Sequence, residues 1–270
     1  MAGVALVLED KVALITGGSR GIGAETVRLF AQAGARVAFS YRQARERAEA
    51  LAVECGGEGR CRAIEQDLAT PADGRALVES AVEAFGRLDI LVVNHGIWPP
   101  HDAPIATMAE AQWRQTLGVN LDSVFGLVQA AVAQMEAQAR VGGEGRSAKD
   151  GAAGHIVLIS STAGQRGEAF HADYAVTKGA LISLTKSLSS ELAPKGIRVN
   201  CVAPGWVMTE MSQGTLKDPE LGPRVAAGIP VGRPGDPQEI AGPVLFLCTP
   251  LAGFISGEVL NVNGGAVLVG

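Results

Sequence analysis

A tyrosine and a lysine, Tyr174 and Lys178, are the side chains whose types and spacing most directly suggest chemistry. They lie in the stretch DYAVTKGALISLTKSLSSEL, residues 173–192, whose apolar residues recur at helical spacing. On a helix, residues four apart share one face, one turn from each other. An ammonium beside a phenol favours the ionised phenol and so makes it a better proton donor. A solvated helix face gives the same pattern, so the pair needs support from the rest of the chain.

A serine offers a third polar group. The stretch GHIVLIS, residues 154–160, predicts a strand, and Ser161 follows it directly. In a parallel sheet, the carboxyl end of a strand and the start of the next helix lie at the same edge, where ligands bind. Ketone reduction needs a hydride at carbon and a proton at oxygen. Tyr174 can give that proton if its pKa falls from about 10 towards neutrality, which takes roughly 4 kcal/mol of preferential phenolate stabilisation. Ser161 would then hold the substrate oxygen.

A glycine-rich turn, TGGSRGIG at residues 16–23, follows a predicted strand at 11–16 and opens a predicted helix. Glycines at such a turn let backbone amides approach a pyrophosphate at the positive end of the helix. The spacing of Gly17, Gly21 and Gly23 differs from the G-x-G-x-x-G fingerprint. Tight packing is the alternative reading of these glycines, and the strand–turn–helix context favours nucleotide binding.

The end of the second predicted strand indicates which nucleotide binds. An NAD site usually places an acidic residue there to hold the ribose hydroxyls. This chain has Tyr41 and then Arg42, with no acid before Glu46. An arginine can hold a 2′-phosphate through charge-assisted hydrogen bonds, and Arg20 in the glycine turn can add a second positive charge. The sequence therefore favours NADP, with ordinary solvated arginines as the alternative.

Two further strand ends are predicted at the same edge. Asp67, in EQDLAT, can accept a hydrogen bond from the adenine amino group, although an aspartate there is also a plausible turn or cap residue. Asn94 and Gly96, in NHG, close the fourth predicted strand over the cofactor.

Apolar runs alternate with amphipathic stretches along the whole chain, which predicts an α/β fold: a doubly wound parallel sheet (Rossmann fold) of about seven strands with helices on both faces. The chain is expected to form one dinucleotide-binding and catalytic domain over residues 1–270. The predicted strands are 11–16, 36–40, 61–66, 89–94, 154–160, 197–203 and 258–263. The predicted helices are 22–33, 43–54, 72–85, 107–138, 173–193 and 236–248. The Gly- and Ala-rich segment 139–153 is expected to be a mobile surface loop.

Composition narrows the function classes. A formal net charge of −5 gives no basic footprint for nucleic acid, and 47% hydrophobic residues with 35 glycines suit a large core with tight turns. The apolar runs are far shorter than a membrane span. The amino terminus has no leader signature, so we expect a cytoplasmic protein that does not bind membranes. The four cysteines show no metal-ligand spacing, so no metal is expected, and Cys201 and Cys248 are expected in the core.

The chain resembles the single-domain branch of the short-chain dehydrogenase/reductase family over essentially its whole length. The matching stretches, in the family's order, are TGGSRGIG, NHG, Asn120, Ser161, YAVTK and PGWVMT (204–209). His95 departs from the small residue that is commoner at its position, and the segment 139–153 is long. We expect neither departure to touch the catalytic residues.

The resemblance implies a catalytic set of Asn120, Ser161, Tyr174 and Lys178. It also implies that Lys178 binds the nicotinamide ribose and that Asn120 positions a water in the proton relay. Val207 and Thr209 match residues that hold the nicotinamide carboxamide and a nearby phosphate. The residues expected to contact the cofactor are Gly17, Ser19, Arg20, Gly21, Ile22, Gly23, Tyr41, Arg42, Asp67, Leu68, Asn94, Gly96, Tyr174, Lys178, Pro204, Gly205, Val207 and Thr209.

The expected function is NADPH-dependent reduction of a ketone, in the style of the 3-oxoacyl-acyl-carrier-protein reductases. Trp98, His101 and Phe170 are expected near the substrate, and the segment 211–235 as a closing lid. The substrate is expected to be a small ketone or an acyl thioester, the latter possible on an acyl carrier protein. A homotetramer is expected by resemblance. A secondary alcohol dehydrogenase, NAD-dependent or acting on another substrate class, and a non-catalytic nucleotide-sensing protein are the alternatives.

Overall fold

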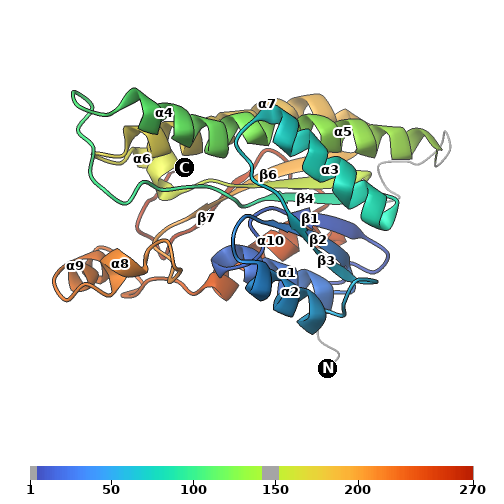
Figure 1. Ribbon diagram of the computed structural model, residues 1–270, viewed down its shortest axis with the longest axis horizontal. Helices are drawn as coiled ribbons and strands as arrows, with labels where there is room; N and C mark the ends of the chain where they lie inside the picture. Colours follow the sequence, from blue (N-terminus) through green and yellow to red (C-terminus); the bar gives the residue numbers. More distant parts are fainter. Residues whose placement is uncertain (1–4, 142–151, 270) are drawn as a thin grey trace.

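A seven-stranded parallel sheet lies at the centre of the computed structural model, which describes residues 5–141 and 152–269. The strand order is β3-β2-β1-β4-β5-β6-β7, with helices on both faces (Figure 1). The strands are β1 (Val12–Ile15), β2 (Arg36–Tyr41), β3 (Cys61–Glu65), β4 (Ile90–Val93), β5 (Gly154–Ile159), β6 (Ile197–Pro204) and β7 (Val259–Val262). The predicted doubly wound α/β fold is confirmed, and each predicted strand is present within about two residues.

Two helical layers sandwich the sheet (Figure 1). One layer contains α1 (Gly21–Gln32), α2 (Arg45–Glu54) and α10 (Pro237–Leu247). The other contains α3 (Pro71–Phe85), α4 (Glu110–Leu117), α5 (Ser123–Val141) and α7 (Ala172–Leu192). Successive side chains of a strand point to opposite faces, so β1 feeds both layers: Ala13 and Ile15 into one, Val12 and Leu14 into the other.

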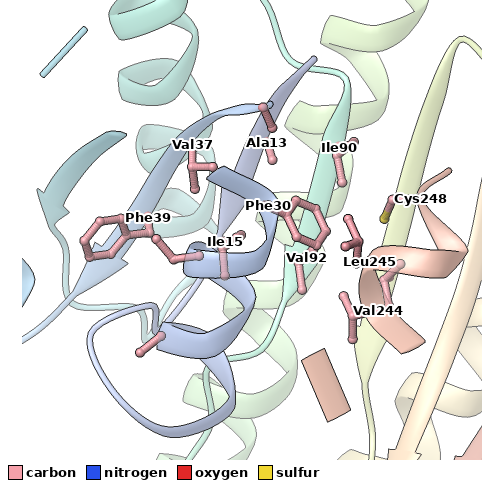
Figure 2. Close-up of a cluster of buried hydrophobic side chains, with 14 of the residues drawn as sticks. Ala13, Ile15, Phe30, Val37, Phe39, Ile90, Val92, Val244, Leu245 and Cys248 are labelled. Atoms are coloured by element: carbon pink, nitrogen blue, oxygen red, sulfur yellow. The ribbon is translucent and has the colours of Figure 1, made fainter. Parts of the chain in front are cut away.

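Figure 2 shows the core on the α1 side of the sheet. The ring of Phe30, on α1, lies over strand side chains that include Ile90 and Val92, with Val244 of α10 close by. Phe30 and Val92 have no exposed surface. Strands buried on both faces are apolar at nearly every position, which is why continuous apolar runs predicted them.

The predicted helix at 107–138 is divided in the structure. A π-helix, η1 (Gly118–Asp122), separates α4 from α5 and contains Asn120. Three short helices were not predicted: α6 (Thr162–Arg166), α8 (Gln213–Leu216) and α9 (Leu221–Ala227). They are too short to show a helical period in the sequence. Residues 139–141 end α5, and residues 142–151 of the segment expected to be a loop lie outside the described residues.

The helical stretch Glu110–Arg140, formed by α4, η1 and α5, is long and apolar enough to cross a membrane by length and composition alone. Its most apolar window is 44% buried, with Leu127 and Met135 in the core beneath it. The stretch packs against α3 along the sheet, so it serves as a core helix of this fold.

The order of the strands reverses direction between β1 and β4, and this reversal opens a ligand-binding crevice. The chain winds outwards from β1 to β2 and β3, then returns to β4 on the other side of β1. The helices that follow β1 and β4 therefore leave the sheet in opposite directions and open a crevice at the carboxyl ends of these strands.

Candidate active site

One pocket runs along the carboxyl ends of the strands. All the residues predicted to contact the cofactor line it except Gly23, and so does Ser161. The glycine turn lies at one end of this lining, and Ser161, Tyr174 and Lys178 at the other. Asn120 and Gly23 are not among the lining residues.

The glycine turn fits a pyrophosphate. Gly17 and Gly21 have φ values of +64° and +51°, which only glycine adopts readily. A Cβ on Gly23 would lie 2.2 Å from the carbonyl oxygen of Gly17, so Gly23 permits the turn to fold closely onto α1. The amino terminus of α1 has no side-chain cap, whereas a capping box of Thr70 and Asp73 closes that of α3. The free amides of α1 suit an anionic ligand.

Asn94 connects β4 to this turn. Its side-chain amide donates to the carbonyl oxygens of Thr16 at 3.0 Å and Gly17 at 3.2 Å. Its backbone N–H donates to the hydroxyl of Thr16 at 2.9 Å. Asn94 thus holds the shape of the turn from the neighbouring strand.

The ends of β2 and β3 carry the residues predicted for the adenosine half. Arg42 forms a loose ion pair with Asp67, at 3.9 Å, and both side chains are more than half exposed. The hydroxyl of Tyr41 donates to Glu65 at 3.3 Å. Glu65 also pairs with Arg45 and does not line the pocket. Arg42, which directly follows β2, is therefore a basic side chain that lines the adenosine end of the pocket.

Tyr174 and Lys178 lie one turn apart near the start of α7. The ammonium of Lys178 is 5.7 Å from the centre of the Tyr174 ring and donates to the carbonyl oxygen of Ile159 at 2.8 Å. Ser161 caps α6 by accepting from the N–H of Ala163 at 3.1 Å, and it lines the pocket together with Tyr174. A Cβ on Gly164 would lie 2.5 Å from the carbonyl carbon of Lys178, so this glycine lets α6 pack close to α7.

Burial makes the phenol of Tyr174 less acidic than a free tyrosine. Burial raises the pKa of Tyr174 to about 12, and the charge of Glu168 acts in the same direction. The hydrogen bond with Ser161 opposes both. Burial also lowers the pKa of Lys178 to about 8. Desolvation disfavours the charged form of each group, so the pKa of Tyr174 rises while that of Lys178 falls, and the two values move apart.

Asn120 forms hydrogen bonds with residues on two neighbouring segments. Its side chain is 1% exposed and bonds the backbone N–H of Ile97 at 2.8 Å and the carbonyl oxygen of Ile97 at 2.9 Å. It also donates to the hydroxyl of Thr177 at 3.2 Å. Both ends of the amide are therefore occupied, and the side chain fixes the segment after β4 against α7.

His95 lines the pocket and contacts residues next to the catalytic set. Its Nε2 lies 3.0 Å from the carbonyl oxygen of Val119 in η1, and its Nδ1 lies 2.8 Å from the hydroxyl of Thr16. A carbonyl oxygen only accepts, so Nε2 carries the proton and Nδ1 accepts from Thr16. Burial lowers the pKa of His95 to about 3, and the charge of Lys178 lowers it further. His95 is a neutral bridge between β1 and the π-helix.

The substrate end of the pocket differs in part from the prediction. Trp98 lines it as expected, but His101 and Phe170 do not. From the stretch 165–171, Arg166 and Glu168 line the pocket instead, and Trp206 joins them from the segment after β6. This stretch follows no helical or strand period, so its residue pattern does not indicate which side chains face inwards.

The cysteines follow the prediction. Cys201 and Cys248 are buried in the core, and all four cysteines are free thiols. Within residues 5–141 and 152–269, no group of histidine, cysteine, aspartate and glutamate side chains is arranged to hold a metal ion.

The whole chain is similar to known proteins. A family model described as Enoyl-(Acyl carrier protein) reductase matches residues 17–267. The chain is 37% identical over 264 residues to L-rhamnose 1-dehydrogenase (NAD(P)(+)) of Azotobacter vinelandii, covering 96% of this chain and 98% of that one. It is 37% identical over 262 residues to the 3-oxoacyl-(acyl-carrier-protein) reductase FabG of Vibrio cholerae, covering 97% and 99%.

A solved structure from Brucella melitensis, named a short-chain dehydrogenase/reductase of the glucose/ribitol dehydrogenase type, superposes with a TM-score of 0.86 at 34% identity. The match covers 98% of this chain and all of that one. The fold agrees with that of this solved structure. The chain therefore belongs to the short-chain dehydrogenase/reductase family, whose members are nicotinamide-dependent oxidoreductases.

Proposed function

We propose that this enzyme uses NADPH to reduce a ketone to a secondary alcohol. The observation that carries the proposal is the convergence of Ser161, Tyr174 and Lys178 at one end of a pocket whose other end is the glycine turn. Three polar groups that serve proton transfer thus lie in the same cavity as a turn suited to a dinucleotide.

The chain's own residues divide the work. Ser161 holds the carbonyl oxygen by donating a hydrogen bond, and Tyr174 donates a proton to the oxygen as it becomes an alkoxide. Bound NADPH would supply the hydride and leave a positive charge on the nicotinamide. Lys178 stabilises the phenolate left on Tyr174 and is placed to bind the ribose, while Asn120 holds the wall behind them.

The high pKa of Tyr174 suits the reductive direction. A phenol whose pKa burial raises to about 12 stays protonated at neutral pH, which is the state that a proton donor needs. Each unit by which the bound state lowers this pKa requires about 1.4 kcal/mol of preferential phenolate stabilisation. The ammonium of Lys178, close to the phenol ring, has the right sign to contribute.

The preference for NADPH rests on Arg42 and Arg20. Both line the pocket, and Arg42 is held only by the loose contact with Asp67. A 2′-phosphate would give these guanidinium groups a doubly charged partner in place of a single distant carboxylate.

Two substrate classes follow from the relatives. A 3-oxoacyl thioester, possible on an acyl carrier protein, corresponds to the reductase of Vibrio cholerae, and a sugar corresponds to the dehydrogenase of Azotobacter vinelandii. Lys195 and Arg198 are basic residues that could meet an acidic carrier protein, but Lys195 pairs with Glu136 at 2.7 Å and Arg198 donates to the carbonyl oxygen of Gly253 at 3.0 Å. NADPH consumption with a panel of ketones and acyl thioesters tests the activity directly, and the absence of any turnover would contradict it.

A homotetramer in the cytoplasm is the proposed state of the enzyme. Phe125 on α5 and Val176 on α7 are 55% and 49% exposed, and Phe254 and Leu268 near the carboxyl end are almost fully exposed. Such apolar side chains mark surfaces that a second copy can cover. Four free thiols suit a reducing compartment.

A further inference from the structure

A carboxylate lines the end of the pocket at which we expect the substrate to bind. Glu168 lines the pocket from the segment between α6 and α7, and it is half-buried. Desolvation is the main influence on its pKa and raises it; the charge of His171, a hydrogen bond with the side chain of Trp98 and the charge of Arg166 act in the opposite direction. The charge of Glu168 raises the pKa of Tyr174, so Glu168 lies near the reacting end of the pocket.

Aromatic rings hold the wall around this carboxylate. Trp98 stacks on His171 with ring centres 4.7 Å apart and an interplanar angle of 16°. Trp206 meets Trp98 edge to face, at 6.3 Å and 85°. Nε2 of His171 donates to the carbonyl oxygen of Pro99 at 3.0 Å, which fixes the stack to the loop after β4. The pocket lining therefore offers both ring surfaces and the acceptor group of Glu168.

An unsubstituted acyl chain fits this wall poorly. Methylene groups packed on Glu168 would remove water from a carboxylate without replacing its hydrogen bonds, which costs free energy. A carboxylate has about four acceptor positions. These positions suit donors on the substrate, while the C–H faces of the substrate lie on the tryptophan rings.

We propose that Glu168 determines specificity by accepting hydrogen bonds from hydroxyl groups next to the reacting carbonyl, so that the enzyme prefers a polyhydroxylated ketone. This inference rests on the proposed ketone reductase activity and narrows its substrate class. It assigns to Glu168 a binding role beside the proton transfer by Tyr174.

The neighbours of Glu168 favour hydroxyl groups over an ammonium group. Arg166 lines the same pocket, and its positive charge already acts on the carboxylate. Asp102 acts in the opposite direction and is the weakest of these influences. A cationic substrate would meet the guanidinium of Arg166, whereas a polyol can use Arg166 as a donor and Glu168 as an acceptor.

The test compares matched ketones in matched variants. L-Erythrulose and 2-butanone share a carbon chain and differ in three hydroxyl groups; an acetoacetyl thioester and aminoacetone complete the panel. Glu168→Leu should lower kcat/KM for erythrulose by about 10- to 100-fold, the size of one charge-assisted hydrogen bond, and should not lower it for 2-butanone. Glu168→Gln, which keeps an acceptor oxygen, should retain most of the preference. Glu83→Leu, an exposed carboxylate on α3 outside the pocket, is the control.

The ratio of the two kcat/KM values is the deciding readout. Loss of Glu168 also changes the field at Tyr174, but that change is common to all substrates and cancels in the ratio. An unchanged ratio in Glu168→Leu would overturn the proposal, as would a preference for aminoacetone or the thioester over erythrulose. If no ketone is reduced, the proposed activity fails, and titration of erythrulose against the fluorescence of Trp98 and Trp206 still decides whether Glu168 binds it.

Discussion

Replacing Tyr174 by phenylalanine tests the proposed chemistry most directly. The substitution keeps the ring that lies 5.7 Å from the ammonium of Lys178 and removes only the hydroxyl. Losing one polar group beside Ser161 should cost no more than about 1 kcal/mol of stability. Ser161 keeps its contact with the N–H of Ala163, so the start of α6 should remain in place.

The effect on turnover should be far larger than the effect on stability. Proton donation by a positioned side chain is typically worth about 10²- to 10⁴-fold, so kcat for ketone reduction should fall by that factor in Tyr174→Phe. Binding of NADPH should change little, because the glycine turn and Arg42 lie at the other end of the pocket. The measurements are kcat at saturating substrate and the dissociation constant of NADPH from a fluorescence titration.

The chain offers a matched control in its other tyrosine. Tyr41→Phe removes a phenol at the adenosine end, where the hydroxyl donates to Glu65, so its effect should appear in the KM for NADPH and not in kcat. Near-normal turnover in Tyr174→Phe would refute the assignment of the proton donor and would leave the Tyr174–Lys178 pair as a structural feature of α7.

Three further predictions follow from charge and exposure. Arg42→Ala should raise the KM for NADPH about tenfold or more without changing that for NADH, whereas Arg45→Ala, beside Glu65, should not; equal kinetics with both cofactors in the unmodified enzyme would contradict this. Burial lowers the folded-state pKa of Lys178 to about 8, against 10.5 when unfolded, so the unfolded chain holds more protons between these pH values. The contribution of Lys178 to the unfolding free energy should therefore rise by about 3 kcal/mol over this window. The buried thiols of Cys61 and Cys201, whose pKa values are raised, act in the opposite direction, so the measurement is the difference in unfolding free energy between the unmodified protein and Lys178→Met in denaturant titrations. A difference that does not change with pH would refute the prediction. Light scattering should give a tetramer mass that falls in Phe125→Asp; a monomer mass for the unmodified protein would exclude the tetramer.

Local patterns predicted much of the fold because each depends on the backbone alone. Strands buried on both faces must be apolar throughout, and a helix must repeat its buried residues at its own period. The glycine turn was also visible, since Gly17 and Gly21 have left-handed φ values that most residues avoid. The same helical period placed Tyr174 and Lys178 on one face of α7.

Contacts between distant segments determined which side chains line the pocket and how acidic they are, and the sequence did not show this. The stretch around Glu168 has no period, so only packing against Trp98 and His171 determines that Glu168 faces the pocket and Phe170 does not. His95 has its role because Val119, 24 residues away, presents a carbonyl oxygen from the π-helix. The pKa of Tyr174 rises instead of falling because burial outweighs the favourable contacts, and burial is a property of the assembled layers rather than of any one segment.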